Sequence, residues 1–266
     1  AVVGSFAFLR KRSLVGDAIA HAILPGIAIS FMLTQSKNPV ILLAGALISG
    51  WIAMYCIEKI QQKTKLSTDG AIAIVLSVFF GIGILLLTHI QHSGEGSQSG
   101  LDQFLFGKAA SMTRQDLMVY SIVALLLLII VTGLYKELML FSFTPDFAQA
   151  SGLPVGVLKT TLNSITVLAI AIGIQSVGVV LMAALLITPA AAARAWTDKL
   201  HWMIIIAAFT GAVSGLVGSY VSFSAPAMPT GPWVVMSLSV LALLSIFMAP
   251  QRGVLSRILR QKANRD

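Results

Sequence analysis

Long apolar runs separated by short polar connections dominate this sequence. The runs cover residues 14–34, 39–57, 70–90, 117–134, 161–193, 202–223 and 233–249. Most of them approach the roughly 20 residues with which an α-helix crosses a bilayer. The pattern predicts an all-α fold, a polytopic membrane helix bundle with a single transmembrane domain over residues 1–266.

The run at 161–193 needs its own interpretation, because it is too long for one crossing and too short for two full ones. Basic residues flank both of its ends, with Lys159 before it and Arg194 after it. Both ends are therefore expected on the same side of the membrane. We expect a short helical hairpin that turns between Gln175 and Gly178, which gives about eight crossings after residue 13. The opening stretch AVVGSFAFL is interpreted as the end of a further span that begins before this sequence.

Composition and charge agree with a membrane protein. Hydrophobic residues make up 57% of the chain and charged residues 11%, whereas a soluble domain is about 25% charged. The net charge of +8 comes largely from connections such as 10–12 and 59–65. Basic residues in alternate connections are typical of cytoplasmic loops, so the charge does not indicate nucleic acid. The single cysteine, Cys56, excludes an intrachain disulfide and a cysteine-based metal site.

Asp17 and His21 are the ionisable pair that stands out inside an apolar run. They are four residues apart, so a helix places them on one face, about 6 Å apart along its axis. A charge near the bilayer centre costs about 2.5–3.5 kcal/mol unless it meets water, a partner or an ion. Pro25 cannot donate a hydrogen bond to the carbonyl of His21, which releases that oxygen. A carboxylate, an imidazole and a carbonyl together suit Mn²⁺ and, less specifically, Fe²⁺ or Zn²⁺. The alternative is that Asp17 caps the helix and His21 is a satisfied core residue.

Other polar motifs are less specific. His89, His92 and Glu95 have ligand spacing but lie in a predicted outer connection, so they form either an outer metal-capture site or a solvated loop. The stretch Ser67–Asp69 precedes an apolar run and predicts a helix cap. The sequence contains no HExxH, GxSxG or phosphate-binding loop, so the chain cannot hydrolyse ATP by the P-loop route.

Two short helices are expected on the cytoplasmic side, near residues 144–153 and 188–198. Each begins with a Thr-Pro pair, Thr144-Pro145 or Thr188-Pro189, in which threonine would be the N-cap and proline the first helical residue. The second continues with an alanine-rich turn, and it is interpreted as a docking element or as an ordinary interfacial cap. Small residues also recur every four positions at Ala207, Gly211, Gly215 and Ser219, and at Gly45, Ser49 and Ala53, which predicts close helix packing, either within the chain or at a subunit interface.

The chain resembles the permease subunits of ABC importers for manganese, zinc and iron. The matching stretches, in order, are LRKRSLVGDAIAHAILPG, STDGAIAIVLSVFFGIGILLL, LDQFLFGKAAS, LMLFSFTPDFAQASGLP and LMAALLITPAAAARAWTDKL. The resemblance implies a type II ABC importer permease in the bacterial inner membrane. It also implies a second permease copy or paralogue, two cytoplasmic ABC ATPase subunits and an extracytoplasmic metal-binding protein. It assigns the metal ligands to Asp17 and His21. It assigns the ATPase-coupling helix to Thr188, Pro189, Ala190, Ala191, Ala192, Ala193, Arg194 and Trp196.

We therefore expect the membrane-spanning permease of an ATP-driven importer for a divalent transition metal, with manganese favoured over zinc or iron. No permanent cofactor is expected beyond the transported cation, and the ATPase activity would reside in a separate chain. One alternative is an ion- or proton-coupled carrier that uses the pair as a proton relay and needs no ATPase. Another is an intramembrane metal-dependent protease, which would require more ligands and a general base within the membrane.

Overall fold

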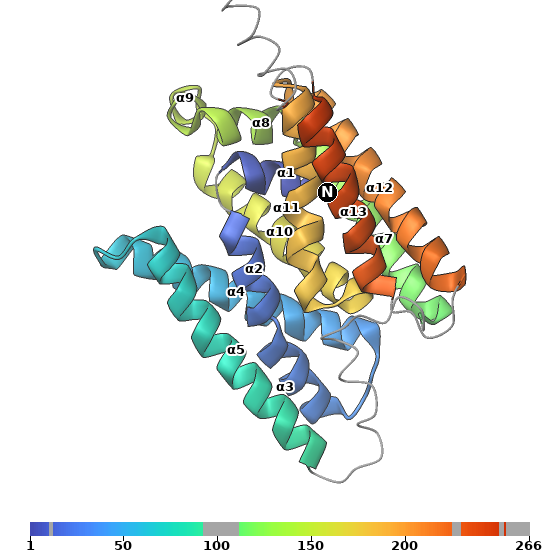
Figure 1. The fold of residues 1–266 in the computed structure, drawn as a ribbon. Helices are drawn as coiled ribbons and strands as arrows, with labels where there is room; N and C mark the ends of the chain where they lie inside the picture. The colour runs from blue at the N-terminus through green and yellow to red at the C-terminus, as the bar shows by residue number, and fades with distance from the viewer. Residues whose placement is uncertain (11–12, 93–111, 225–229, 250–252, 254–266) are drawn as a thin grey trace, which may run out of the picture. The chain divides into compact units, whose positions relative to one another are not determined.

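The computed structural model describes residues 1–266 except 11–12, 93–111, 225–229, 250–252 and 254–266. Within these residues all regular secondary structure is α-helical (Figure 1). The helices are α1 (Val2–Leu9), α2 (Ser13–Ala22), α3 (Leu24–Thr34), α4 (Pro39–Lys63), α5 (Thr68–His92), α7 (Arg114–Gly133), α8 (Tyr135–Phe143), α9 (Pro145–Ala150), α10 (Val155–Val177), α11 (Val179–Trp196), α12 (Leu200–Ser224) and α13 (Thr230–Met248).

The number and placement of the long helices confirm the predicted polytopic bundle. Among the described residues, seven segments are long and apolar enough to cross a membrane, and the α2–α3 segment Leu14–Thr34 counts as one of them. The eighth predicted crossing corresponds to a shorter apolar helix, Leu181–Trp196. Each apolar run of the sequence therefore became helix, and the run at 161–193 became two.

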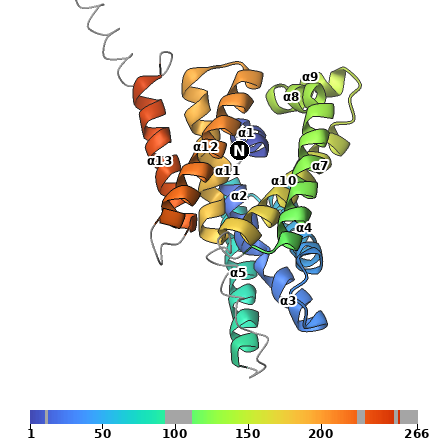
Figure 2. The ribbon, with the colours of Figure 1, turned by 90° about the vertical axis from the view of Figure 1, so that its right-hand side faces the viewer.

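The chain forms two compact units, which we describe separately. One comprises residues 12–183, and the other comprises residues 1–11 together with 184–266. In the first, α2 and α3 pack along α5 and α4, and α10 packs on α2 and α4 (Figures 1 and 2). In the second, α12 and α13 pack against each other, and α1 packs against α12. The single domain expected over residues 1–266 stays a prediction.

Two interruptions in the helices follow from single residues. The break between α10 and α11 lies at Gly178, whose φ of 90° and ψ of 164° are accessible essentially only to glycine. The break confirms that the run divides between Gln175 and Gly178, and the return of α11 to the same side of the membrane as a hairpin stays a prediction. The α2–α3 segment is interrupted at Ile23, two residues before Pro25, whose ring nitrogen has no hydrogen to donate to the preceding turn.

Small residues let α3 and α4 approach backbone to backbone. A Cβ atom added to Gly26 would lie 2.1 Å from the carbonyl oxygen of Gly45. The Ser49 hydroxyl donates to the carbonyl of Ala22 at 2.6 Å, beside the interruption in α2–α3. The predicted stripe of Gly45, Ser49 and Ala53 is therefore used for packing within the chain.

On α12 the contact with α13 follows a different face from the predicted stripe. A Cβ atom at Gly218 would lie 2.5 Å from Val234 Cα, whereas one at Gly215 would meet nothing within 4 Å. The Ser237 hydroxyl donates to the carbonyl of Ser214 at 2.9 Å. The face of α12 that packs on α13 is thus Ser214 and Gly218. The predicted stripe packs within the chain at Ala207, which is fully buried, and at Gly211, where an added Cβ atom would lie 3.2 Å from Ala1 Cβ. Its use at Gly215 and Ser219 stays a prediction. Spacing of small residues alone does not distinguish two adjacent faces of a helix that carries small residues on both.

Candidate metal centre

Asp17 and His21 lie one turn apart on α2, as predicted. Asp17 Oδ1 and His21 Nε2 are 3.7 Å apart, which exceeds the hydrogen-bond range of about 2.7–3.2 Å. Two donor atoms that each lie about 2.1 Å from one cation are separated by about 3.6 Å when they subtend an angle of about 120° at it. The two side chains therefore have the spacing of two ligands of one cation.

The surroundings of the pair bear on the alternative interpretation of a helix cap and a satisfied histidine. Asp17 lies inside α2, which begins at Ser13, so it is not the N-cap residue. The His21 ring meets the Phe80 ring of α5 edge to face, with centroids 4.8 Å apart. His21 Nδ1 is buried and has no hydrogen-bond partner among the described residues. The histidine is thus held by an aromatic contact, and its Nδ1 atom finds no hydrogen-bond partner in the part of the chain that the structure describes.

The opposite face of α2 serves packing. Gly50 of α4 lies against Val167 of α10 and against Ile23 and Ile19 of α2. At 100° per residue, these two isoleucines point roughly 160–240° away from Asp17 and His21. The pair therefore faces away from the α4–α10 contact, on the side where α5 contributes Phe80.

The pair supplies only two side-chain ligands. Among the described residues, no group of three or more His, Cys, Asp or Glu side chains could hold a metal ion. Asp17 is 41% exposed and His21 is 22% exposed, so a cation could reach both side chains. A complete coordination sphere would need oxygen or nitrogen atoms from elsewhere.

The second candidate group is only partly described. His89 and His92 lie in the last turn of α5, and His92 Nδ1 donates to the Thr88 carbonyl at 2.8 Å. Glu95 lies outside the described residues. Metal capture by His89, His92 and Glu95 therefore stays a prediction.

The structure contains the first of the two expected cytoplasmic helices. The first, predicted near residues 144–153, is present as α9, with Pro145 as its first residue and Gly152 at φ 79° just after its end. Thr144 occupies the N-cap position, but its hydroxyl donates back to the Leu140 carbonyl instead of capping α9.

The second expected helix, near residues 188–198, does not exist as a separate element. The helix α11 continues through Thr188 and Pro189 to Trp196, so the predicted start at Thr188 was wrong. A proline removes one hydrogen bond, here to the Leu185 carbonyl, and the apolar turns on both sides continue the helix.

The alanine run is also less exposed than a docking surface requires. Ala190, Ala192 and Ala193 are fully buried, and Ala190 and Ala193 pack with Met203 and Ala207 of α12. Arg194 closes the end of α11 by pairing with the Asp198 carboxylate at 2.9 Å and donating to its carbonyl at 3.0 Å. Trp196 donates to the Ser245 hydroxyl, which in turn donates to the Ala192 carbonyl. The exposed part of this segment is therefore the turn after α11, at residues 196–199.

Two polar contacts between helices escaped the sequence analysis. Glu58 of α4 meets Lys159 and Asn163 of α10, and Tyr120 of α7 donates to Gln175 of α10 at 3.0 Å. The predicted apolar run ends at residue 57, just before Glu58, but α4 continues to Lys63. Each pair joins residues far apart in the sequence, and no local pattern links them.

Comparison with known proteins identifies related sequences along the whole chain. A family model described as "ABC 3 transport family" matches residues 1–249. The chain is 48% identical over 259 residues to the manganese transport system membrane protein MntC of Bacillus subtilis, covering 97% of this chain and 60% of that protein. It is 44% identical over 261 residues to the zinc transport system membrane protein TroC of Treponema pallidum, covering 98% and 88%.

Solved structures agree with these matches. The fold is similar to that of PsaBC from Streptococcus pneumoniae, determined in complex with Fab, with a TM-score of 0.85 and 32% identity over 98% of this chain and 89% of that chain. A transporter described as of the metal-chelate ABC type, in an inward-facing conformation, gives a TM-score of 0.64 at 17% identity over 92% and 82%. The second match shows likeness of fold alone.

Proposed function

The chain belongs to the ABC 3 transport family, and on that premise we propose that it conducts a divalent transition metal, with manganese as the favoured cargo. It is a multi-pass membrane permease without ATPase activity of its own, in keeping with the absence of a P-loop from its sequence. The observation that carries the proposal is the 3.7 Å separation of Asp17 Oδ1 and His21 Nε2.

The chemistry of the pair favours a cation of intermediate hardness. A carboxylate and an imidazole together suit Mn²⁺, Fe²⁺ and Zn²⁺, and cysteine-rich sites are the ones that select softer metals. Relatives named for manganese transport and for zinc transport are similar to this chain. We favour manganese because the relative with 48% identity is named for it.

The proposed complex supplies the metal ligands and the ATP hydrolysis that one copy of this chain does not provide. Asp17 and His21 supply two ligands, so a second permease copy or paralogue would supply two more across a shared axis. Energy would come from two cytoplasmic ABC ATPase subunits, and an extracytoplasmic metal-binding protein would deliver the cation. We propose that the ATPase contacts the exposed turn at residues 196–199 rather than the buried alanines before it.

The test is uptake of radioactive manganese by cells that lack this chain and regain it as wild type or as a variant. Asp17→Asn and His21→Ala should each lower uptake at least about tenfold, because the first removes the charge that offsets the cation and the second removes a ligand. Asp146→Asn and His201→Ala are matched controls, since both residues are exposed and lie far from the pair in sequence.

Stability measured on the same variants separates a ligand from a structural group. Removing an ionisable group from a membrane-embedded helix relieves its cost of burial, so both site variants should unfold at or above the temperature of the parent. Normal uptake with either Asp17→Asn or His21→Ala would show that the pair is not on the path of the cation.

A further inference from the structure

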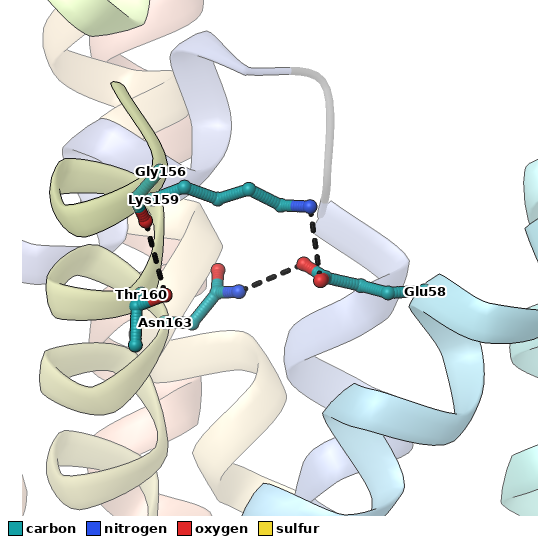
Figure 3. Close-up of polar contacts among 5 residues, drawn as sticks. All are labelled: Glu58, Gly156, Lys159, Thr160 and Asn163. Carbon is teal, nitrogen blue, oxygen red and sulfur yellow. Dashed lines mark hydrogen bonds and ion pairs between the residues drawn. The ribbon is translucent and has the colours of Figure 1, made fainter. Parts of the chain in front are cut away.

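A polar cluster ties α4 to α10 on the side of α2 opposite to the metal pair. Glu58 Oε2 lies 2.9 Å from Lys159 Nζ, and Asn163 Nδ2 donates to Glu58 Oε1 at 2.9 Å. Figure 3 shows the Lys159 side chain reaching across to the carboxylate above the amide of Asn163. Both carboxylate oxygens are therefore engaged by donors of this chain, which leaves little for a metal ion.

The location of the cluster separates it from the proposed cation path. Gly50 and Val167 pack on Ile19 and Ile23 of α2, which point away from Asp17 and His21. Glu58 lies two helical turns beyond Gly50 on α4, and Asn163 lies one turn before Val167 on α10. The cluster thus lies about 12 Å along α4 from the point where Gly50 meets α2.

A groove opens beside this cluster. A cavity of about 110 Å³ is lined by Trp51, Met54, Tyr55, Glu58, Thr160, Asn163 and Val167. Trp51 and Tyr55 also line an adjoining open hollow along α4, where the other lining residues are Leu47, Ile48 and Ile52. Within this unit Ile48, Trp51, Ile52 and Tyr55 are about half exposed or more. One groove therefore runs from an apolar helix face to a polar end.

The polar end of the groove carries net positive charge. Lys59 Nζ lies 5.3 Å from the centroid of the Tyr55 ring, and Lys63 follows one turn later on the same helix face. Lys159 adds a third ammonium, and Glu58 is the one carboxylate of the cluster. An ammonium has three N–H donors, so Lys159 can bind a further acceptor while it stays paired with Glu58.

We propose that this groove is a binding site for an anionic phospholipid of the cytoplasmic leaflet. The acyl chain lies along Ile48, Trp51 and Ile52, and the phosphate is bound by Lys59 and Lys159. Apolar residues followed by aromatic residues and then lysines are the order that a lipid meets from tail to headgroup. The basic end of α4 places this site at the cytoplasmic surface, where anionic headgroups attract lysines.

The test uses tryptophan quenching by brominated lipids on the purified full-length permease complex in bilayer discs. Phosphatidylglycerol and phosphatidylcholine, each carrying bromine on its acyl chains, are compared at equal mole fractions in an otherwise unlabelled neutral bilayer. The difference between the parent and Trp51→Phe isolates the signal of Trp51. We expect Trp51 to be quenched more strongly by the brominated anionic lipid.

Charge variants test the headgroup contacts. Lys59→Gln and Lys159→Gln should each lower the preference for the anionic lipid about fivefold, and Lys136→Gln, an exposed lysine elsewhere in the same unit, should leave it unchanged. Lys59→Gln leaves the Glu58 pair intact, so it remains informative if Lys159→Gln weakens folding. Equal quenching by the two lipids would overturn the proposal. A lack of quenching of Trp51 by either lipid would also overturn the proposal, since a protein subunit would then cover this face of α4.

Discussion

At the scale of single residues, the closest approach of α3 and α4 depends on the absence of one methyl group. Gly26 faces the Gly45 carbonyl, and a Cβ atom there would lie 2.1 Å from that oxygen. Backbone atoms cannot rotate away as the end of a side chain can. The two helices would have to separate, and the Ser49–Ala22 hydrogen bond at 2.6 Å lies beside the same contact.

We therefore expect Gly26→Ala to lower the free energy of unfolding by about 3 kcal/mol. The matched control is Gly81→Ala on α5, where an added Cβ meets nothing within 4 Å. That change should be neutral or stabilising by up to about 1 kcal/mol, because alanine favours the helix. Thermal unfolding of both variants in one detergent checks the difference, and equal unfolding temperatures would contradict the packing described here.

The metal pair belongs to the same scale, and it shows how far local spacing reaches. A spacing of four residues on one helix predicts that Asp17 and His21 share a face. The structure places Asp17 Oδ1 and His21 Nε2 3.7 Å apart. Local spacing does not predict the contact of His21 with Phe80, because that contact joins α2 to α5. Nothing in the sequence around His21 indicates which residue of another helix will hold its ring.

At the scale of elements, the break between α10 and α11 rests on Gly178. Its φ of 90° and ψ of 164° lie where a side chain would be strained. Gly178→Ala should therefore destabilise the protein by about 1–3 kcal/mol. Gly156→Ala, in the first turn of α10 with no atom within 4 Å of an added Cβ, should not destabilise it. Denaturation midpoints of the two variants give the comparison.

The burial of the alanines on α11 leads to another prediction at this scale. Ala192 is fully buried, and its carbonyl accepts from Ser245. Ala192→Glu would place a carboxylate in a packed helix contact, so we expect a loss of about 3 kcal/mol or more and a low yield of folded protein. Ala191→Glu, at a half-buried position, should fold and still copurify with the ATPase, because the proposed contact lies at residues 196–199.

Yield, thermal stability and copurification with the ATPase distinguish the two effects. If Ala192→Glu folds well but does not copurify with the ATPase, the segment near residues 188–198 is an exposed docking helix, as the sequence predicted. A misfolded Ala191→Glu protein would show that this alanine, too, belongs to the core.

At the scale of the whole molecule, the proposed function places ATP hydrolysis and permeation in different chains. The sequence contains no phosphate-binding loop, and the chain belongs to a family of transport permeases. The purified chain alone should therefore neither hydrolyse ATP nor concentrate manganese in liposomes. Adding the ATPase subunits should establish both activities. Hydrolysis by the permease alone at the rate of the assembled complex would contradict this division of labour.

The sequence by itself determined the elements that depend only on neighbours along the chain. Apolar runs became helices because a bilayer offers the backbone no other partners for its hydrogen bonds. Three further features also depend only on neighbouring residues. They are the break near Gly178, the shared face of Asp17 and His21, and the cap at Ser67, whose hydroxyl accepts from the Gly70 N–H at 3.1 Å. The start predicted at Thr188 failed because a Thr-Pro pair also occurs inside a helix whose flanking turns are apolar.

Tertiary structure decided which faces of those helices meet. Glu58 and Lys159 are separated by 101 positions in the sequence, and only the packing of α4 on α10 brings their charges to 2.9 Å. In the other unit, packing on α12 buries Ala190 and Ala193 of α11, and the contact of α12 with α13 uses Gly218 rather than Gly215. The physical reason is that nearly every face of a membrane helix is apolar, so hydrophobicity predicts that a segment spans but not which side it turns toward its neighbours.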